Sequence, residues 1–262
     1  MIFKFIFCVC VVAISGSSAE RPTQKIIGGD WATIDEAPWH VIILYNRVGG
    51  DDLKRYEYET SGALIRDDLI VAPAWSLSQE DRFRKVRAGS NGAMVLGEIA
   101  DIKEIIVHEQ FDGNDYDIAV VLLQAPYKLT ELITPIPLIS RGVNYPEATW
   151  ATITGYGTQS LPGNPVWWLK KVAVPLVNHD LCVEAYLKYN VTVTDRELCA
   201  GDLNYPYDTP CYLDGGGPLV INQELVGLFN KHWNCGLNGD PTVYVDIAVL
   251  RDWLQDKIDN VH

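Results

Sequence analysis

The chain has 262 residues, of which 48% are hydrophobic and 21% are charged, with 21 Gly, 14 Pro and a formal net charge of -13. This composition is typical of a globular protein and excludes fibrous, collagen-like and disordered classes, and the length suits one large domain or two small ones. The acidic balance, with a pI near 4.7, argues against nucleic-acid binding and against docking on anionic lipid, and it leaves a cationic or apolar partner open.

Residues 1–19 have the layout of a secretory signal peptide. A short basic start is followed by an unbroken apolar run over residues 5–14 and by small residues up to Ala19 that resemble a signal-peptidase site. The alternative is a buried N-terminal strand. The run is too short to span a membrane, and no later segment approaches the required length. We therefore expect a secreted mature protein with no membrane span.

Secretion changes the count of cysteines and charges. Cys8 and Cys10 leave with the signal peptide, and the four cysteines that remain allow three pairings. An oxidising compartment favours two disulfides among them. Removal of residues 1–25 takes away three basic side chains and one acidic one, which leaves 18 basic and 33 acidic residues and a net charge of -15.

Short apolar segments separated by turn residues run along most of the chain. Strands are expected at residues 40–45, 63–65, 69–71, 118–123, 151–154, 172–174, 219–221 and 225–229. Many short strands at this spacing predict a sandwich or a barrel. Near the end, Ile247, Leu250, Leu254 and Ile258 recur at steps of three and four, which predicts an amphipathic helix. The expected fold class is all-β with a C-terminal α-helix.

Ordered motifs along the chain carry a family resemblance. The main ones are Lys25-Ile26-Ile27-Gly28-Gly29, Tyr116-Asp117-Ile118-Ala119 and Leu213-Asp214-Gly215-Gly216-Gly217-Pro218; residues 61–65, 155–157, 171–175, 197–201 and 241–244 add further matches. From residue 26 to the C-terminus the chain resembles the trypsin and chymotrypsin-like serine proteases. The resemblance implies two six-stranded antiparallel β-barrels, the N-terminal one at about residues 26–137 and the C-terminal one, with the helix, at about 138–262, and an active cleft between them.

Two of the three positions of the family's catalytic triad are altered. The family's histidine is replaced by Trp75, and its nucleophilic serine by Gly215, so that only the aspartate, Asp117, is kept. An indole cannot accept the serine proton, because its N–H only donates. On this resemblance we expect no catalytic residue and a protein that is not an enzyme.

Another histidine could in principle replace the missing base. None of the candidates lies in the base-carrying motif, and each is expected to be a surface or strand histidine. The candidates are His40, His108, His179, His232 and His262.

The resemblance also implies an altered oxyanion hole and specificity pocket. Leu213 stands where the family has a glycine whose backbone N–H helps to bind the oxyanion. Thr209 stands where trypsin-like members carry an acid, although a shift of one residue would place Asp208 there. His232 and Thr242 align with glycines that keep the pocket open. We expect a closed or occupied cleft.

Activation residues are retained. The resemblance implies cleavage between Lys25 and Ile26, after a short propeptide at residues 20–25, and a buried ion pair between the new Ile26 amine and Asp214. The alternative is that Asp214 only accepts hydrogen bonds in a turn.

The resemblance implies the disulfides Cys182–Cys199 and Cys211–Cys235, whereas the family's bridge beside the catalytic histidine would join the positions of Thr60 and Ser76. Both of those cysteines are absent, so the loop that carries Trp75 is expected to be less constrained. Asn190-Val191-Thr192 is a glycosylation sequon, which makes Asn190 a candidate modification site.

Within the family the chain most resembles the mite group 3 allergen branch and, there, the inactivated protease paralogues of the scabies mite. This resemblance implies secretion into the mite gut lumen and excreta, binding of host complement proteins and inhibition of complement activation. The first alternative is a decoy or regulator of active mite proteases and their inhibitors; the second is an unorthodox peptidase, which the altered triad disfavours. We expect a monomer without cofactor, metal or nucleic acid.

Overall fold

The computed structural model describes residues 29–79, 81–157, 167–203, 209–211, 213–236 and 238–261. The predicted signal peptide, the propeptide, Lys25, Ile26, Asp208 and His262 lie outside these ranges. Within them, no helix is both long and apolar enough to cross a membrane.

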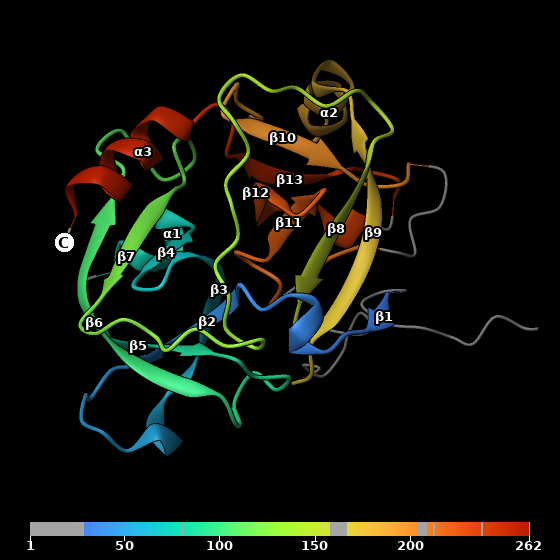
Figure 1. Cartoon of the computed structure of the whole chain (residues 1–262). Coiled ribbons are helices and arrows are strands. Elements are labelled where there is room, and N and C mark those ends of the chain that lie inside the picture. The colour runs from blue at the N-terminus through green and yellow to red at the C-terminus, as the bar shows by residue number, and fades with distance from the viewer. Residues whose placement is uncertain are drawn as a thin grey trace, which may run out of the picture.

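The first six long strands close into a barrel (Figure 1). All neighbours pair antiparallel, in the order β2-β3-β4-β7-β6-β5. The strands are β2 (His40–Asn46), β3 (Glu57–Arg66), β4 (Leu69–Ala72), β5 (Phe83–Ala88), β6 (Glu98–Val107) and β7 (Ala119–Leu123). The short helix η1 (Ile34–Glu36) precedes β2, and the short helices η2 (Leu53–Arg55) and α1 (Ala74–Leu77) lie between strands of this barrel.

A second ring of six antiparallel strands follows, in the order β8-β9-β10-β13-β12-β11, and it closes because β8 pairs with both β9 and β11. The two-residue strand β1 (Asp30–Trp31) adds to the outer side of β9. The strands of the ring are β8 (Trp150–Gly155), β9 (Lys170–Val177), β10 (Glu197–Ala200), β11 (Pro218–Ile221), β12 (Glu224–Lys231) and β13 (Thr242–Asp246). The helices of this half are α2 (His179–Leu187), η3 (Asn234–Gly236) and α3 (Arg251–Asn260). The predicted fold class, two six-stranded antiparallel barrels with a C-terminal helix, is confirmed.

The two barrels share a core. Along β7, Val121 packs inside the first barrel, whereas Val120 and Leu122 belong to a cluster that continues into the second barrel. A strand that is buried on both faces reads as a continuous apolar run, which is the pattern of residues 118–123. The apolar seam between the barrels therefore fixes the loops that meet at its end.

The C-terminal helix returns to the first barrel. Arg66 of β3 donates hydrogen bonds to the carbonyl oxygens of Ile258 and Val261, at 2.8 and 2.9 Å, and so satisfies the end of α3. Trp253 and Lys257 of α3 both contact the Glu109 carboxylate. In Figure 1, α3 accordingly lies beside β6 and β7.

Candidate active site between the two barrels

The fold brings the three predicted triad positions together. Trp75 lies on α1, directly after β4; Asp117 precedes β7; and Gly215 lies in the loop before β11. The Trp75 backbone N–H donates to Asp117 Oδ1 at 2.7 Å. A Cβ atom at Gly215 would lie 3.6 Å from Trp75 Cζ2, which is ordinary contact. The positions are adjacent in space although they are far apart in sequence.

Asp117 is buried, with 4% of its surface exposed. Burial raises the pKa of Asp117 to about 7, although the backbone N–H groups of Trp75 and Ala74 act in the opposite direction. Nearby Glu197 raises the pKa further, and Lys231 lowers it. The carboxyl group therefore anchors the backbone of α1 and changes charge near neutral pH.

The loop from Leu213 to Gly217 is held by backbone contacts with both barrels. Gly215 O accepts hydrogen bonds from Ser61 N at 2.8 Å and from Thr60 Oγ1 at 3.0 Å, and Gly216 N donates to Phe229 O at 2.8 Å. Leu213 has a φ of 70°, a left-handed conformation that costs a residue with a side chain about 1–2 kcal/mol. Among the described residues, the N–H groups of Leu213 and Gly215 donate to no acceptor. They can donate to a carbonyl oxygen of a bound segment.

Side chains at the predicted specificity-pocket positions pack together beside an open cavity. Thr209 and Thr242 are buried, and their hydroxyl oxygens lie 3.3 Å apart. His232 Nδ1 accepts from Cys235 N at 2.8 Å, and burial lowers the pKa of His232 to about 4. His232 also helps to line a neighbouring cavity of about 630 Å³, together with Trp75, Leu213 and Trp233. Thr209 and Thr242 are thus buried beside an open cavity, and the role of these residues in specificity stays a prediction.

Asp214 is fully buried in a pocket that two glycines make possible. Its carboxylate accepts from Gly157 N at 2.7 Å and from Cys211 N at 2.8 Å. A Cβ at Gly155 or Gly157 would approach the carboxylate to within 2.3 Å or less. Burial raises the pKa of Asp214 to about 7, against the effect of these hydrogen bonds. The turn hydrogen bonds are present, and the ion pair with the Ile26 amine stays a prediction.

A histidine–serine contact, which the sequence reasoning missed, lies behind this loop. His40 Nε2 lies 2.8 Å from Ser61 Oγ, and His40 Nδ1 lies 2.7 Å from Thr154 Oγ1. His40 and Ser61 are 1% and 0% exposed, and burial lowers the pKa of His40 to about 3. The imidazole is therefore neutral at physiological pH. We expected each histidine to be a surface or strand residue, and His40 does lie on strand β2. The expectation did not include its contacts with Ser61 and Thr154, because these residues are 21 and 114 positions away in the sequence.

Polar contacts occupy the positions of the absent bridge. Thr60 and Ser76 are buried. Arg84 of β5 donates two hydrogen bonds to the Glu59 carboxylate, at 2.7 and 3.1 Å, and a third to Ser76 O at 3.1 Å. Arg84 and Glu59 are 5% and 2% exposed. The guanidinium thus connects β3 to α1, the helix that carries Trp75.

The structure has the disulfides Cys182–Cys199 and Cys211–Cys235, which is the pairing that the resemblance implies. The Cys211 and Cys235 sulfurs and a His232 nitrogen lie within 4.8 Å of one another. The two sulfurs are joined, however, and a metal is bound by the thiolate form. Asn190 is exposed beside α2, and its glycosylation remains a prediction.

Comparison with known proteins identifies the family. The trypsin family model matches residues 26–254. The chain belongs to the trypsin family. It is 28% identical to a vitellin-degrading protease of Bombyx mori over 265 residues, which cover 98% of this chain and 96% of that protein. It is 27% identical to a trypsin of Phaedon cochleariae, with 97% and 98% covered, and 27% identical to trypsin 5G1 of Aedes aegypti, with 96% and 94% covered.

These findings correct one expectation. The prediction that this trypsin-family chain is not an enzyme is contradicted, because the family and its relatives are named as proteases. The contact between His40 and Ser61 also supplies a histidine–serine pair, the combination that serine proteases use. The inference failed because it judged each histidine, His40 included, by its absence from the base-carrying motif and did not foresee the contact of His40 with Ser61.

Proposed function

We propose that this trypsin-family protein is secreted and binds other proteins at the opening between its barrels. The observation that carries the proposal is the apolar rim of the cleft: Trp75, Trp233 and Leu213 are 45%, 41% and 37% exposed around one cavity. Tryptophan is enriched at the energetic centres of protein interfaces. Large apolar side chains that gather at the surface of a soluble protein mark interaction sites.

Host complement proteins are the proposed partners, and inhibition of complement activation is the proposed consequence. This part rests on the motifs that resemble the mite group 3 allergen branch, as does a location in the mite gut lumen and excreta. The relatives named above are insect proteins, so they support the family and not the partner.

The test is complement-mediated haemolysis in human serum, titrated with the mature protein and with a heat-denatured control. We expect dose-dependent protection from the folded protein. A Trp75→Ala, Trp233→Ala double variant should lose protection, whereas Trp31→Ala should keep it, because Trp31 is 60% exposed but does not line the cleft. Absence of protection at saturating protein would overturn complement inhibition and favour the alternative, a decoy or regulator of mite proteases and their inhibitors.

Peptide-bond hydrolysis is a second candidate function, favoured by the relatives named as proteases and by the His40–Ser61 contact. Because both side chains are buried, a substrate reaches this pair only after the surrounding side chains move. The test is turnover of peptide substrates, together with labelling by a serine-directed phosphonate. Activity that is lost in Ser61→Ala would assign hydrolysis to the pair; no turnover by the folded protein, or turnover that Ser61→Ala leaves unchanged, would refute this assignment.

A further inference from the structure

A groove of about 710 Å³ lies on the outer face of the second barrel, and none of its lining residues lines the cleft. Its floor consists of side chains from β8 and β9, including Thr152 and Ala173. These alternate with Ala151, Ile153 and Val174, which point into the core. The groove is therefore built on a rigid sheet face.

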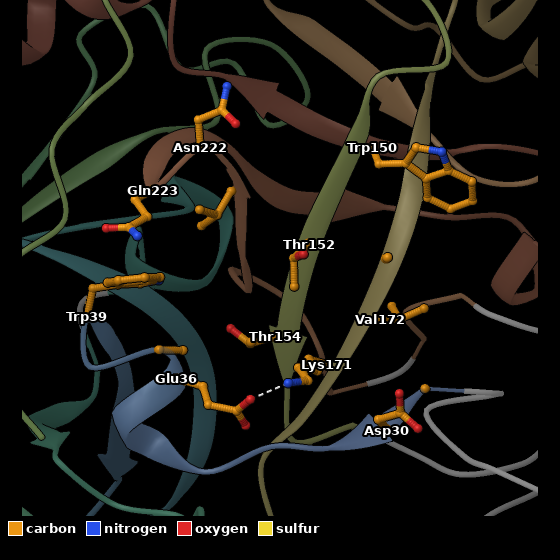
Figure 2. A pocket seen from close by; sticks show the side chains of 14 residues that line it. Asp30, Glu36, Trp39, Trp150, Thr152, Thr154, Lys171, Val172, Asn222 and Gln223 are labelled. Atoms are coloured by element: carbon orange, nitrogen blue, oxygen red, sulfur yellow. Dashed lines mark hydrogen bonds and ion pairs between the residues drawn. The ribbon is translucent and has the colours of Figure 1, made fainter.

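Two indoles stand on opposite sides of this groove (Figure 2). Trp150, at the start of β8, is 62% exposed. Trp39, just before β2, is partly buried and packs against the cores. Figure 2 shows Thr152 between them, and Asn222 and Gln223 above Trp39. The two indole rings thus flank a groove whose floor carries a hydroxyl group and whose rim carries amide groups.

Partner strands interrupt the backbone edges of the floor. β8 pairs with both β9 and β11, and β9 pairs with β8 on one side and, near its two ends, with β1 and β10 on the other. An extended peptide gains affinity by adding to a continuous free sheet edge, and the second edge of both β8 and β9 is interrupted by these partners. We therefore assign recognition in this groove to side chains.

The backbone of the Asn222–Gln223 turn is conformationally strained, and a binding role for its amide side chains would explain why these residues are kept there. Both residues are left-handed, with φ values of 50° and 63°, and they join β11 to β12 as a two-residue hairpin loop. Glycine is the usual residue at the second position of such a turn. Gln223 is strained there, and retained strain is a feature of binding sites.

The charges of the groove are nearly balanced. Lys171, the one cation among the described lining residues, is ion-paired with Glu36. Asp30 adds a carboxylate at one end. An anionic ligand would thus find no free cation there, whereas carboxylate, amide and hydroxyl groups all bond to neutral hydroxyls.

We propose that this groove binds a neutral oligosaccharide, with the apolar face of a sugar ring against the Trp150 indole and with sugar hydroxyls bonded to Thr152 and to the amides of Asn222 and Gln223. Aromatic rings that supply apolar area, together with a few fixed polar groups, are the composition of a small-molecule site, and the volume falls in the usual range. This site is independent of the protein-binding cleft.

The test is ligand-observed NMR and titration calorimetry of the mature protein with three probes: maltotriose, laminaritriose and tri-N-acetylchitotriose. We expect at least one probe to bind saturably, with a dissociation constant of about 1 mM or below. Trp150→Ala should weaken binding about tenfold, and Thr152→Val, which keeps the shape and removes the hydroxyl, about fivefold. Trp168→Ala is the matched control, because Trp168 is 49% exposed and does not line the groove.

Gln223→Gly separates binding from folding. Glycine relieves the left-handed strain, so this variant should be at least as stable as the parent in thermal unfolding. Its saccharide affinity should nevertheless fall, because the amide is gone. Failure of all three probes to bind, or binding that Trp150→Ala and Gln223→Gly leave unchanged, would overturn the proposal; neither result bears on the haemolysis assay.

Discussion

Two adjacent glycines in the cleft should respond very differently to alanine. At Gly215 an added Cβ meets only Trp75 Cζ2 at 3.6 Å and Thr60 Oγ1 at 3.8 Å, so a methyl group fits. At Gly216 the φ is +75°, and an added Cβ would lie 2.0 Å from Ser61 O. That oxygen belongs to the backbone of β3, a strand in the closed first barrel, and cannot turn away as a flexible side chain could.

The magnitudes follow from these contacts. The left-handed φ alone costs alanine about 1–2 kcal/mol, and displacement of the loop from β3 also weakens the Gly216 N to Phe229 O hydrogen bond, worth about 1 kcal/mol. With the backbone overlap added, we expect Gly216→Ala to lower the free energy of unfolding by about 4 kcal/mol or more. Gly215→Ala should change it by no more than about 0.5 kcal/mol.

The free energy of unfolding of both variants is measured by urea unfolding, monitored by tryptophan fluorescence and by circular dichroism. Agreement of the two signals, and of the dependence of the unfolding free energy on urea concentration, verifies the two-state assumption. Gly215→Ala is the matched control, since the chemical change and the loop are the same. A difference of less than about 1 kcal/mol between the two variants would refute the close approach of the loop to β3. The cleft geometry described above would then be wrong.

Three further predictions concern buried charges. The stability of Asp117→Asn relative to the parent should rise by up to about 4 kcal/mol between pH 4 and pH 8. The pKa of Asp117 is raised to about 7 in the folded protein, so the parent loses stability as its unfolded state ionises above pH 4, whereas the asparagine does not titrate. Equal pH profiles of the unfolding free energy for the two proteins would contradict this. Arg84→Lys should lower the free energy of unfolding by about 1 kcal/mol and Arg84→Ala by about 2 kcal/mol, because the buried Glu59 carboxylate then keeps only its ion pair with Arg82. Thermal unfolding that leaves both variants at the parent's midpoint would contradict a stabilising Arg84–Glu59 ion pair. At pH 7, a chain that begins at Ile26 should unfold at a higher temperature than one that begins at residue 20, because only the first can form the ion pair between the Ile26 amine and Asp214. Asp214→Asn should abolish this difference in unfolding temperature. A difference that survives in Asp214→Asn would rule out the ion pair.

The sequence predicted strands best where both faces are buried. The run at residues 118–123 was visible because it is apolar throughout, and it corresponds to β7. By contrast, β5 and β6 were missed because charged side chains interrupt Phe83–Ala88 and Glu98–Val107. The terminal helix was predicted, but it begins at Arg251, after the turn that contains Ile247 and Leu250.

The site was predictable only where a motif marks it. Trp75, Asp117 and Gly215 were placed together by resemblance, and the structure brings them into contact. His40 and Ser61 carry no such mark, because their contact arises from the register in which β2 pairs with β3. The groove was equally hidden, since its residues come from four separate parts of the chain.

Loss of the bridge at Thr60 and Ser76 has a specific chemical consequence for the cleft. In place of a covalent bond, a desolvated ion pair between Arg84 and Glu59, extended to Ser76 O, connects the barrel to the helix of Trp75. A buried charge pair destabilises strongly when one partner is removed, but it is indifferent to reductants. Reduction should therefore open only the two disulfides of the second barrel, and the position of Trp75 should respond to Arg84 substitution and not to thiols. The chain has eight tryptophans, so the difference in indole fluorescence between the parent and a Trp75→Phe variant isolates the Trp75 signal and would distinguish these two dependences.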